Sequence, residues 1–272
     1  MRLQSELRRS RALCILNFAF CISAAAACGP RRVTLPSDPG TPLPDVAQIH
    51  AEVSAACAGV RTLTAVLGLS GRAGDERLRG SIHAGFARPS SMRLEGVPPL
   101  GGAVFILTAR ANAATLVLPR ESRIVRNASP EAILGALTGV ALAPADLQAI
   151  LTGCVVPAPK PTLGRLHANG QASIELAGNA TIYLRRVANR WQLHAARRDG
   201  WQIEYPAFEG TFPRSVRLQS TSPDVRVDLT ATINEIETNL DLEADVFSVE
   251  LRGDERPLSL EELREAGPLR GQ

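Results

Sequence analysis

The stretch RTLTAVLGLSGR, residues 61–72, shows which secondary structure dominates the chain. Leu63, Ala65, Leu67 and Leu69 occupy every second position, and mostly threonine, glycine or serine stands between them. Because successive side chains of a strand point to opposite faces, this alternation predicts a β-strand with one apolar face. RLRGSIHAGFA, residues 77–87, repeats the pattern, and the glycines between the two stretches indicate a hairpin loop.

Similar short runs follow along most of the chain, divided by Gly, Pro, Asn or Asp. They are Met92–Val97, Val104–Ala109, Ala114–Leu118, Arg123–Arg126, Ala172–Leu176, Ala180–Val187, Trp191–Ala196, Trp201–Tyr205, Ser215–Gln219 and Val225–Thr232. Short alternating strands of this kind are typical of an antiparallel sheet, and a sheet of about ten or eleven strands is long enough to curl. The fold class expected is therefore α+β, mainly β, with a curled antiparallel sheet.

Helical spacing appears before and within the strand series. Apolar residues from Val46 to Val60 recur every three or four positions behind a candidate N-cap, Asp45, and the helix should end at Gly59. In the insertion, Ser129 and Pro130 open one short helix.

A second short helix of the insertion should run from Pro144 to Gly153. The two insertion helices share a leucine-rich surface, so we expect them to cover the concave side of the sheet. Near the C-terminus, Ser259 and Glu262 form a capping-box pattern, which predicts a short solvated helix with a frayed end.

The N-terminus has the plan of an export signal. Four arginines within residues 1–11 precede an apolar stretch from Leu13 to Ala27, which is shorter than the roughly 20 residues of a spanning helix. Ala25 to Ala27 followed by Cys28 resemble the lipobox of bacterial lipoproteins, although leucine is usual at the position of Ala25.

This resemblance implies that Cys28 becomes the first residue of the mature protein and carries a diacylglycerol on its sulfur and an acyl chain, such as palmitate, on its amine. Gly29 after it resembles lipoproteins sent to the outer membrane. The alternative is ordinary secretion, with Cys28 left as a thiol.

The chain is expected to hold one folded domain behind a tether. Residues 1–27 would be the signal peptide, 28–44 a Pro/Gly-rich tether, 45–251 the folded domain and 252–272 a C-terminal tail with a short helix. Without the signal peptide, 26 basic and 26 acidic residues remain. This balance does not favour a nucleic-acid partner, which would require a clustered positive face.

Two cysteines remain in the expected domain, Cys57 and Cys154, each at the end of a predicted helix. Export to an oxidising compartment permits a disulfide between them. The alternative is a pair of buried thiols that act as small apolar residues.

The sequence has no motif typical of an active site. The four histidines lack acidic or thiol companions at metal-ligand spacing, and Ser70 in GLSGR does not match the G-x-S-x-G pattern or its structural context. Acid pairs such as Asp241 with Glu243 have no apolar surroundings that would separate their pKa values. We therefore expect no enzyme, no metal and no cofactor.

Three stretches resemble the LolA and LolB family of lipoprotein-localisation factors. They are LTAVLGLSGR after the first helix, LTGVALAPADLQAILTG in the insertion, and INEIETNLDLEADVFSVEL, whose Ile236, Asn239, Leu240 and Phe247 resemble the closing strands of the family. The similarity extends from about Asp45 to Leu251 and is nearest to uncharacterised lipoproteins of this superfamily.

The resemblance implies an incomplete barrel with an apolar cavity for acyl chains. Alternation then suggests which residues line this cavity, the alternative for each being ordinary core packing. The candidates are Leu67, Leu69, Ile82, Phe86, Leu94, Phe105 and Leu107 from the sheet, and Leu134, Leu137, Leu147 and Leu151 from the insertion. In the family member of the outer membrane an exposed apolar loop passes lipoproteins on, and EGVPPLGGAVF, with Val97 and Leu100, is a weak equivalent.

The sequence therefore favours a monomeric, lipid-anchored protein on the periplasmic face of the outer membrane that binds acyl chains of lipoproteins or lipids. Its role would be in lipoprotein localisation. The alternative is a structural or sensor lipoprotein that binds a protein partner in the periplasm.

Overall fold

The computed structural model describes residues 33–98, 100–154, 160–223 and 225–266. All of them belong to one of the two compact units of the chain, Val33–Gln272. The predicted signal peptide and Cys28 lie outside the described residues. Each described helix is too short or too polar to cross a membrane.

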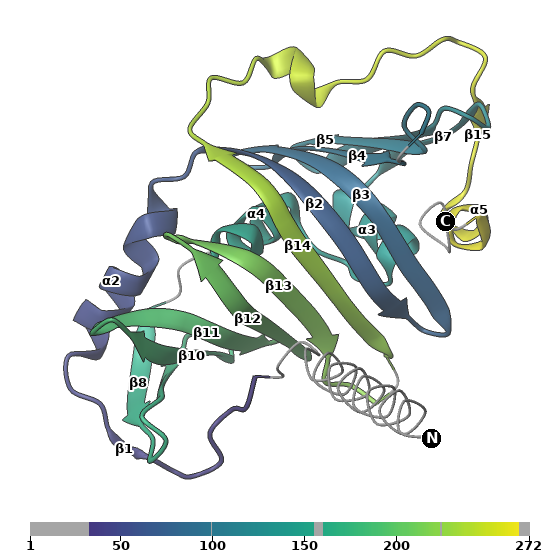
Figure 1. Cartoon of the computed structure of the whole chain (residues 1–272). Helices are drawn as coiled ribbons and strands as arrows, with labels where there is room; N and C mark the ends of the chain where they lie inside the picture. Colours follow the sequence, from purple (N-terminus) through teal and green to yellow (C-terminus); the bar gives the residue numbers. More distant parts are fainter. Residues whose placement is uncertain (1–32, 99, 155–159, 224, 267–272) are drawn as a thin grey trace, which may run out of the picture. The chain divides into compact units, whose positions relative to one another are not determined.

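The described part of the chain is organised around one large sheet that does not close on itself (Figure 1). Its spatial order is β1-β8-β9-β10-β11-β12-β13-β14-β2-β3-β4-β5-β6-β7-β15. The neighbours are antiparallel except for the parallel pair β7 and β15. The fold class expected from the sequence is confirmed.

The strands have the following bounds: β1 Thr41–Pro42, β2 Thr62–Ala73, β3 Glu76–Ala87, β4 Ser91–Val97, β5 Phe105–Arg110, β6 Ala113–Leu118, β7 Arg123–Ala128, β8 Pro161–Leu166, β9 Ala172–Leu176, β10 Ala180–Val187, β11 Arg190–Arg198, β12 Trp201–Glu209, β13 Phe212–Ser220, β14 Val227–Thr238 and β15 Arg256–Pro257. Fifteen strands exceed the ten or eleven expected. β1 and β15 are two-residue strands, and β8 was missed because exposed Leu163 and buried Gly164 reverse the usual alternation.

The cross-strand register places the apolar positions of neighbouring strands on one face of the sheet. Leu67 lies opposite Ile82, and Leu69 lies opposite Ala231. Since directly paired residues point to the same side, these side chains form a continuous apolar inner face. Gly71 allows β2 and β14 to approach, because a side chain there would overlap the backbone of Asp228.

Three helices contact this sheet in the places that the sequence predicts. α2 (Val46–Ala58) runs along β8 and β11. α3 (Pro130–Thr138) and α4 (Pro144–Thr152) lie on the inner, concave face of the sheet, which curves around them (Figure 1). The hydroxyl of Ser129 caps α3 by accepting a hydrogen bond from the Ala132 N–H at 3.1 Å. α3 and α4 both end at a glycine in the left-handed region.

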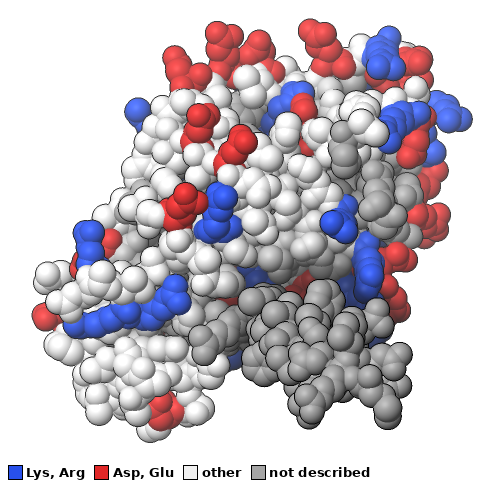
Figure 2. Space-filling view, viewed as in Figure 1, with Lys and Arg blue, Asp and Glu red and all other residues white. Residues whose placement is uncertain are grey.

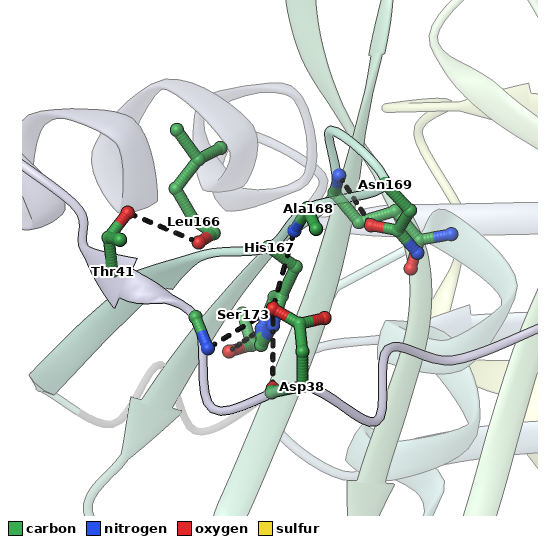
Figure 3. A network of polar contacts seen from close by, with 9 residues as sticks. Asp38, Thr41, Leu166, His167, Ala168, Asn169 and Ser173 are labelled. Carbon is green, nitrogen blue, oxygen red and sulfur yellow. Dashed lines mark hydrogen bonds and ion pairs between the residues drawn. The ribbon is translucent and has the colours of Figure 1, made fainter.

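Part of the segment assigned to the tether is docked on the sheet. Thr41–Pro42 pairs with β8, and Leu43 is buried. Asp38 accepts hydrogen bonds from the backbone N–H groups of Gly40 and Ala168 (Figure 3). His167 contacts the Asp38 carbonyl oxygen through Nδ1 at 3.1 Å. Residues 38–44 therefore belong to the folded unit.

The opposite edge of the sheet is covered by the end of the described chain. After β14 the chain passes through a 3₁₀ turn, η1 (Ala244–Phe247). Phe247 was expected in a closing strand, and it lies in this turn instead. The capping box that opens α5 (Leu260–Ala266) is present, with Glu262 and Ser259 exchanging two hydrogen bonds. The charged residues of α5 are exposed, as expected for a solvated helix, but Leu263 is buried and α5 packs against α3. The expected frayed end lies outside the described residues.

Candidate functional site

A cavity of about 130 Å³ lies between the inner face of the sheet and the helices α3 and α4. Its lining comes from strands β2, β3, β4, β13 and β14, from both helices and from their connection. Thr138 is the one polar residue in this lining, and its hydroxyl donates to the Leu134 carbonyl oxygen at 2.8 Å. We call this space the apolar cavity.

Eight of the eleven residues that the sequence suggests for a cavity line this one. They are Leu67, Leu69, Ile82, Phe86, Leu94, Leu134, Leu147 and Leu151. The other three, Phe105, Leu107 and Leu137, are buried in the surrounding core instead. Alternation gives the side of a strand correctly, but it does not show how far along the sheet the cavity extends.

The sequence prediction missed further lining residues on β13, β14 and α4. They are Val216, Leu218, Leu229, Ala231 and Ile150, and the α3–α4 connection adds Val140 and Leu142. The same alternation in the predicted strands Ser215–Gln219 and Val225–Thr232 could have found the first four. Their place beside β2 depends on the pairing of β14 with β2, which a local pattern does not show.

The size and lining of the apolar cavity limit what the observed closed form can hold. An aliphatic cavity of about 150 Å³ in another protein stays free of water and binds a molecule of the size of benzene. The apolar cavity is similar in volume and lining, so it has room for an apolar group of about six carbon atoms. A longer chain would require α3 and α4 to move away from the sheet.

A second cavity, of about 150 Å³, lies on the other side of α4, against strands β10 to β13. It shares Leu142, Ile150 and Leu218 with the apolar cavity. Its lining also includes Asp146, Arg197, Arg198 and Asp199. We call it the polar cavity, and the shared residues make the two cavities neighbours along one trough.

An ion pair joins α4 to the sheet at the polar cavity. Asp146 Oδ1 lies 3.5 Å from Arg198 Nη1, and Arg198 Nε lies 2.9 Å from Asp199 Oδ2. Burial raises the pKa of Asp146, and the charges of Glu131 and Asp199 raise it further, while Arg198 and a hydrogen bond from the backbone of Ala143 lower it. The net direction is upward, so the ionised carboxylate of Asp146 is costly in this place.

The C-terminal end of α4 is held from the other side. The structure joins Cys57 to Cys154 in a disulfide, with Cα atoms 6.0 Å apart. The buried side chain of Gln148 lies 3.5 Å from the carbonyl oxygen of Val60 and 3.4 Å from that of Arg61. α4 is thus linked to α2 by the disulfide after its last turn and to the residues before β2 by Gln148 in its middle. At its N-terminal end an ion pair joins it to β11, and it also packs against β13.

Other features that could mark a functional site do not gather in one place in the described residues. Among the described residues, no three His, Cys, Asp or Glu side chains are grouped as metal ligands. Leu100, in the loop between β4 and β5, is 88% exposed. On the face seen in Figure 2, basic side chains are interspersed with acidic ones and with uncharged surface.

Comparison with known proteins finds similarity at the level of fold. No family model matches the sequence, and no curated protein matches it. Among solved structures, a LolA superfamily protein from Nitrosomonas europaea is 8% identical over 77% of this chain and 98% of that chain, with a TM-score of 0.46. A DUF1329 family protein from Desulfovibrio piger is 13% identical over 76% and 97% of the two chains, with a TM-score of 0.41.

The lipoprotein LppX of Mycobacterium tuberculosis is 9% identical over 74% of this chain and 99% of that chain, with a TM-score of 0.32. At these identities the similarity concerns the fold alone. The incomplete barrel implied by the LolA and LolB resemblance is the fold observed.

Proposed function

We propose that the chain is a lipid-binding protein whose half-barrel holds an acyl chain beneath α3 and α4. The observation that carries this proposal is the apolar cavity, whose lining is aliphatic except for Phe86 and Thr138. It comes from the sheet and from the two helices α3 and α4, which we call the lid. A hydrocarbon chain needs a dry site without directional contacts, and such a lining supplies it.

The affinity expected for an acyl chain requires the lid to open. Each buried methylene contributes about 0.8 kcal/mol, and micromolar binding corresponds to about 8 kcal/mol. About ten methylenes must therefore be buried, which is more than the closed cavity holds. The ion pair of Asp146 with Arg198 is a loose contact at the N-terminal end of α4, so we place the opening there.

The cellular setting that we propose follows from the N-terminal sequence. Export, acylation of Cys28 and retention at the outer membrane would place the half-barrel in the periplasm, where it could bind lipoproteins or lipids during their localisation. No catalysis is part of this proposal. Labelling cells with radioactive palmitate tests the anchor: the wild-type chain should be labelled, and Cys28→Ser should be neither labelled nor retained in membranes. Equal membrane retention of the two would contradict it.

Mass spectrometry of lipids extracted from the purified protein tests the binding function. The full chain should carry Cys28→Ser, so that a lipid on its own N-terminus is not mistaken for a ligand. We expect an acyl lipid in near-stoichiometric amount. A preparation without lipid that also fails to bind added dodecyl compounds would overturn the proposal, and would favour a sensor or scaffold that binds a periplasmic protein.

A further inference from the structure

The two cavities are connected along one face of α4. Asp146 and Ile150 are four residues apart, so their side chains lie on the same side of the helix, about one turn from each other. Asp146 lines the polar cavity, while Ile150 lines both cavities. A chain that leaves the apolar cavity along Ile150 therefore arrives at the ion pair of Asp146 with Arg198.

Arg198 is the cation that faces α4 at this point. Its neighbour Arg197 is directed elsewhere, because its Nε donates to Gln202 Oε1 at 3.1 Å and its guanidinium lies over the ring of Tyr183. Arg198 Nε is engaged by Asp199, whose side chain is 65% exposed. Its Nη1 is directed at Asp146 across the gap between β11 and α4.

The contact between Asp146 and Arg198 is weak enough to be exchanged. Its 3.5 Å separation exceeds the 2.7 to 2.9 Å that is usual for a charge-assisted hydrogen bond. The upward direction of the pKa of Asp146 shows that burial outweighs the attraction of Arg198. An anion that approached Arg198 closely would replace a partner whose charge is costly where it stands.

We propose that the site takes a single-chain anionic amphiphile, whose tail fills the apolar cavity and whose head binds Arg198 in place of Asp146. The inference rests on the proposed function and adds the class of ligand. Carboxylate and phosphate heads share the required chemistry, since both accept hydrogen bonds from a guanidinium. Displacing Asp146 also removes the contact that holds the N-terminal end of α4, so head binding and lid opening occur together.

Displacement of the neutral fluorescent probe N-phenyl-1-naphthylamine from the delipidated full chain with Cys28→Ser tests this proposal. The competitors share one tail and differ in the head: dodecanoate, dodecyl phosphate, dodecanol and dodecyltrimethylammonium, each below its critical micelle concentration. We expect the two anions to bind at least tenfold more tightly than the alcohol and the cation. A preference for one anion supports the proposal and identifies the head.

Variants assign the preference to one residue. Arg198→Gln should weaken the anions about tenfold and leave dodecanol unchanged, which also shows that the cavity is intact. Asp146→Asn should tighten the anions, since it removes the competing charge. Arg79→Gln, the same change on an exposed residue of β3, is the control for net charge and should change nothing.

Two results would overturn the inference. Equal binding of dodecanoate and dodecanol, unchanged in Arg198→Gln, would show that the head is not recognised, and the proposed function would stand. An equal loss in Arg198→Gln and Arg79→Gln would show that the overall charge attracts the anion. If none of the four compounds displaces the probe, the proposed function itself fails.

Discussion

Two strips of the inner face use the same residue types and differ in whether the space above them is filled. The filled strip, Met92, Phe105, Leu107 and Leu116 on β4 to β6, is at most 1% exposed. The hollow strip consists of the residues of β2, β13 and β14 that line the apolar cavity. Both strips alternate along their strands in the same way.

The difference arises from the lid and from one small side chain. α3 contacts β6 and buries Ile133 and Leu137 completely or nearly so. Over the hollow strip, Ala231 occupies an inward position opposite Leu69, where a larger residue would reach toward α4. Filling therefore depends on the helix side chains above a strand and on the size of the inward residues, and alternation within the strand does not reveal it.

The largest effect should follow from releasing the lid. Cys57→Ala with Cys154→Ala removes a link between positions 97 residues apart, and should lower the free energy of unfolding by about 4 kcal/mol. Urea denaturation of the full chain measures this. Dithiothreitol should lower the stability of the wild type to the same value and leave the double variant unchanged. Free thiols in the folded, oxidised protein would contradict the prediction.

The next largest effect should come from truncating leucines to alanine, and the loss of stability should differ between the two strips. Leu107→Ala in the filled strip should cost about 3 kcal/mol, because Leu107 is fully buried between Leu94 and Leu116. Leu69→Ala beside the cavity should cost about 1 kcal/mol, since Leu69 is only partly buried and already borders open space. Chemical denaturation under identical conditions gives both values. Equal losses would mean that the hollow strip is packed as tightly as the filled one.

Much of the architecture could be predicted from local pattern. Alternation between Leu63 and Leu69 identified β2 and its buried face, and Ser129, Pro130 and Gly153 marked helix ends. The misses are elements defined by distant partners. β1 and β15 are two residues long and exist because β8 and β7 lie beside them, and α5 packs against α3 with Leu263 buried.

Only the apolar part of the candidate site could be predicted from the sequence. Leucines of β2, β4 and the insertion share one face, so a period of two on the strands and helical spacing on the two helices place them together. The pair of Asp146 and Arg198 has no signature in the sequence, because its members lie 52 positions apart and meet through the β11–β12 hairpin. Phe105 and Leu107 were assigned to the cavity because alternation is the same in both strips.

Filling the hollow strip should abolish ligand binding with little effect on folding. Ala231→Leu adds apolar volume inside the apolar cavity, so displacement of N-phenyl-1-naphthylamine by dodecanoate should weaken by at least tenfold. The unfolding free energy should change by less than about 1 kcal/mol, since added contacts offset any strain. Thr232→Leu, on the exposed face of the same strand, is the matched control and should bind normally. Unchanged binding by Ala231→Leu would place the ligand elsewhere.

A buried hydroxyl on the inner face should be dispensable. Tyr205 is fully buried, and its hydroxyl has no hydrogen-bond partner within the part of the chain that the structure describes. Burial raises the pKa of this phenol. Tyr205→Phe should therefore raise the free energy of unfolding by about 1 kcal/mol, because an unsatisfied polar group is removed. Tyr183→Phe, a partly exposed tyrosine of β10, is the control and should change stability little. A destabilised Tyr205→Phe would reveal a partner for the hydroxyl.

The smallest effect should come from the charge at the polar end of the trough. Burial raises the pKa of Asp146 in the folded state above its ordinary value of 3.8. Between pH 3.8 and the folded-state pKa, the folded state therefore binds more protons than the unfolded state. The contribution of Asp146 to stability is therefore fully present below pH 3.8 and is lost as the pH rises through the folded pKa. Asp146→Asn removes this loss, so its stability relative to the wild type should increase with pH across that window. Thermal unfolding from pH 3 to pH 7 measures the difference, with Asp241→Asn, the same change at an exposed position after β14, as the control. A relative stability that falls with pH would mean that Arg198 holds Asp146 firmly, and that the lid is latched too strongly for a lipid head to displace it.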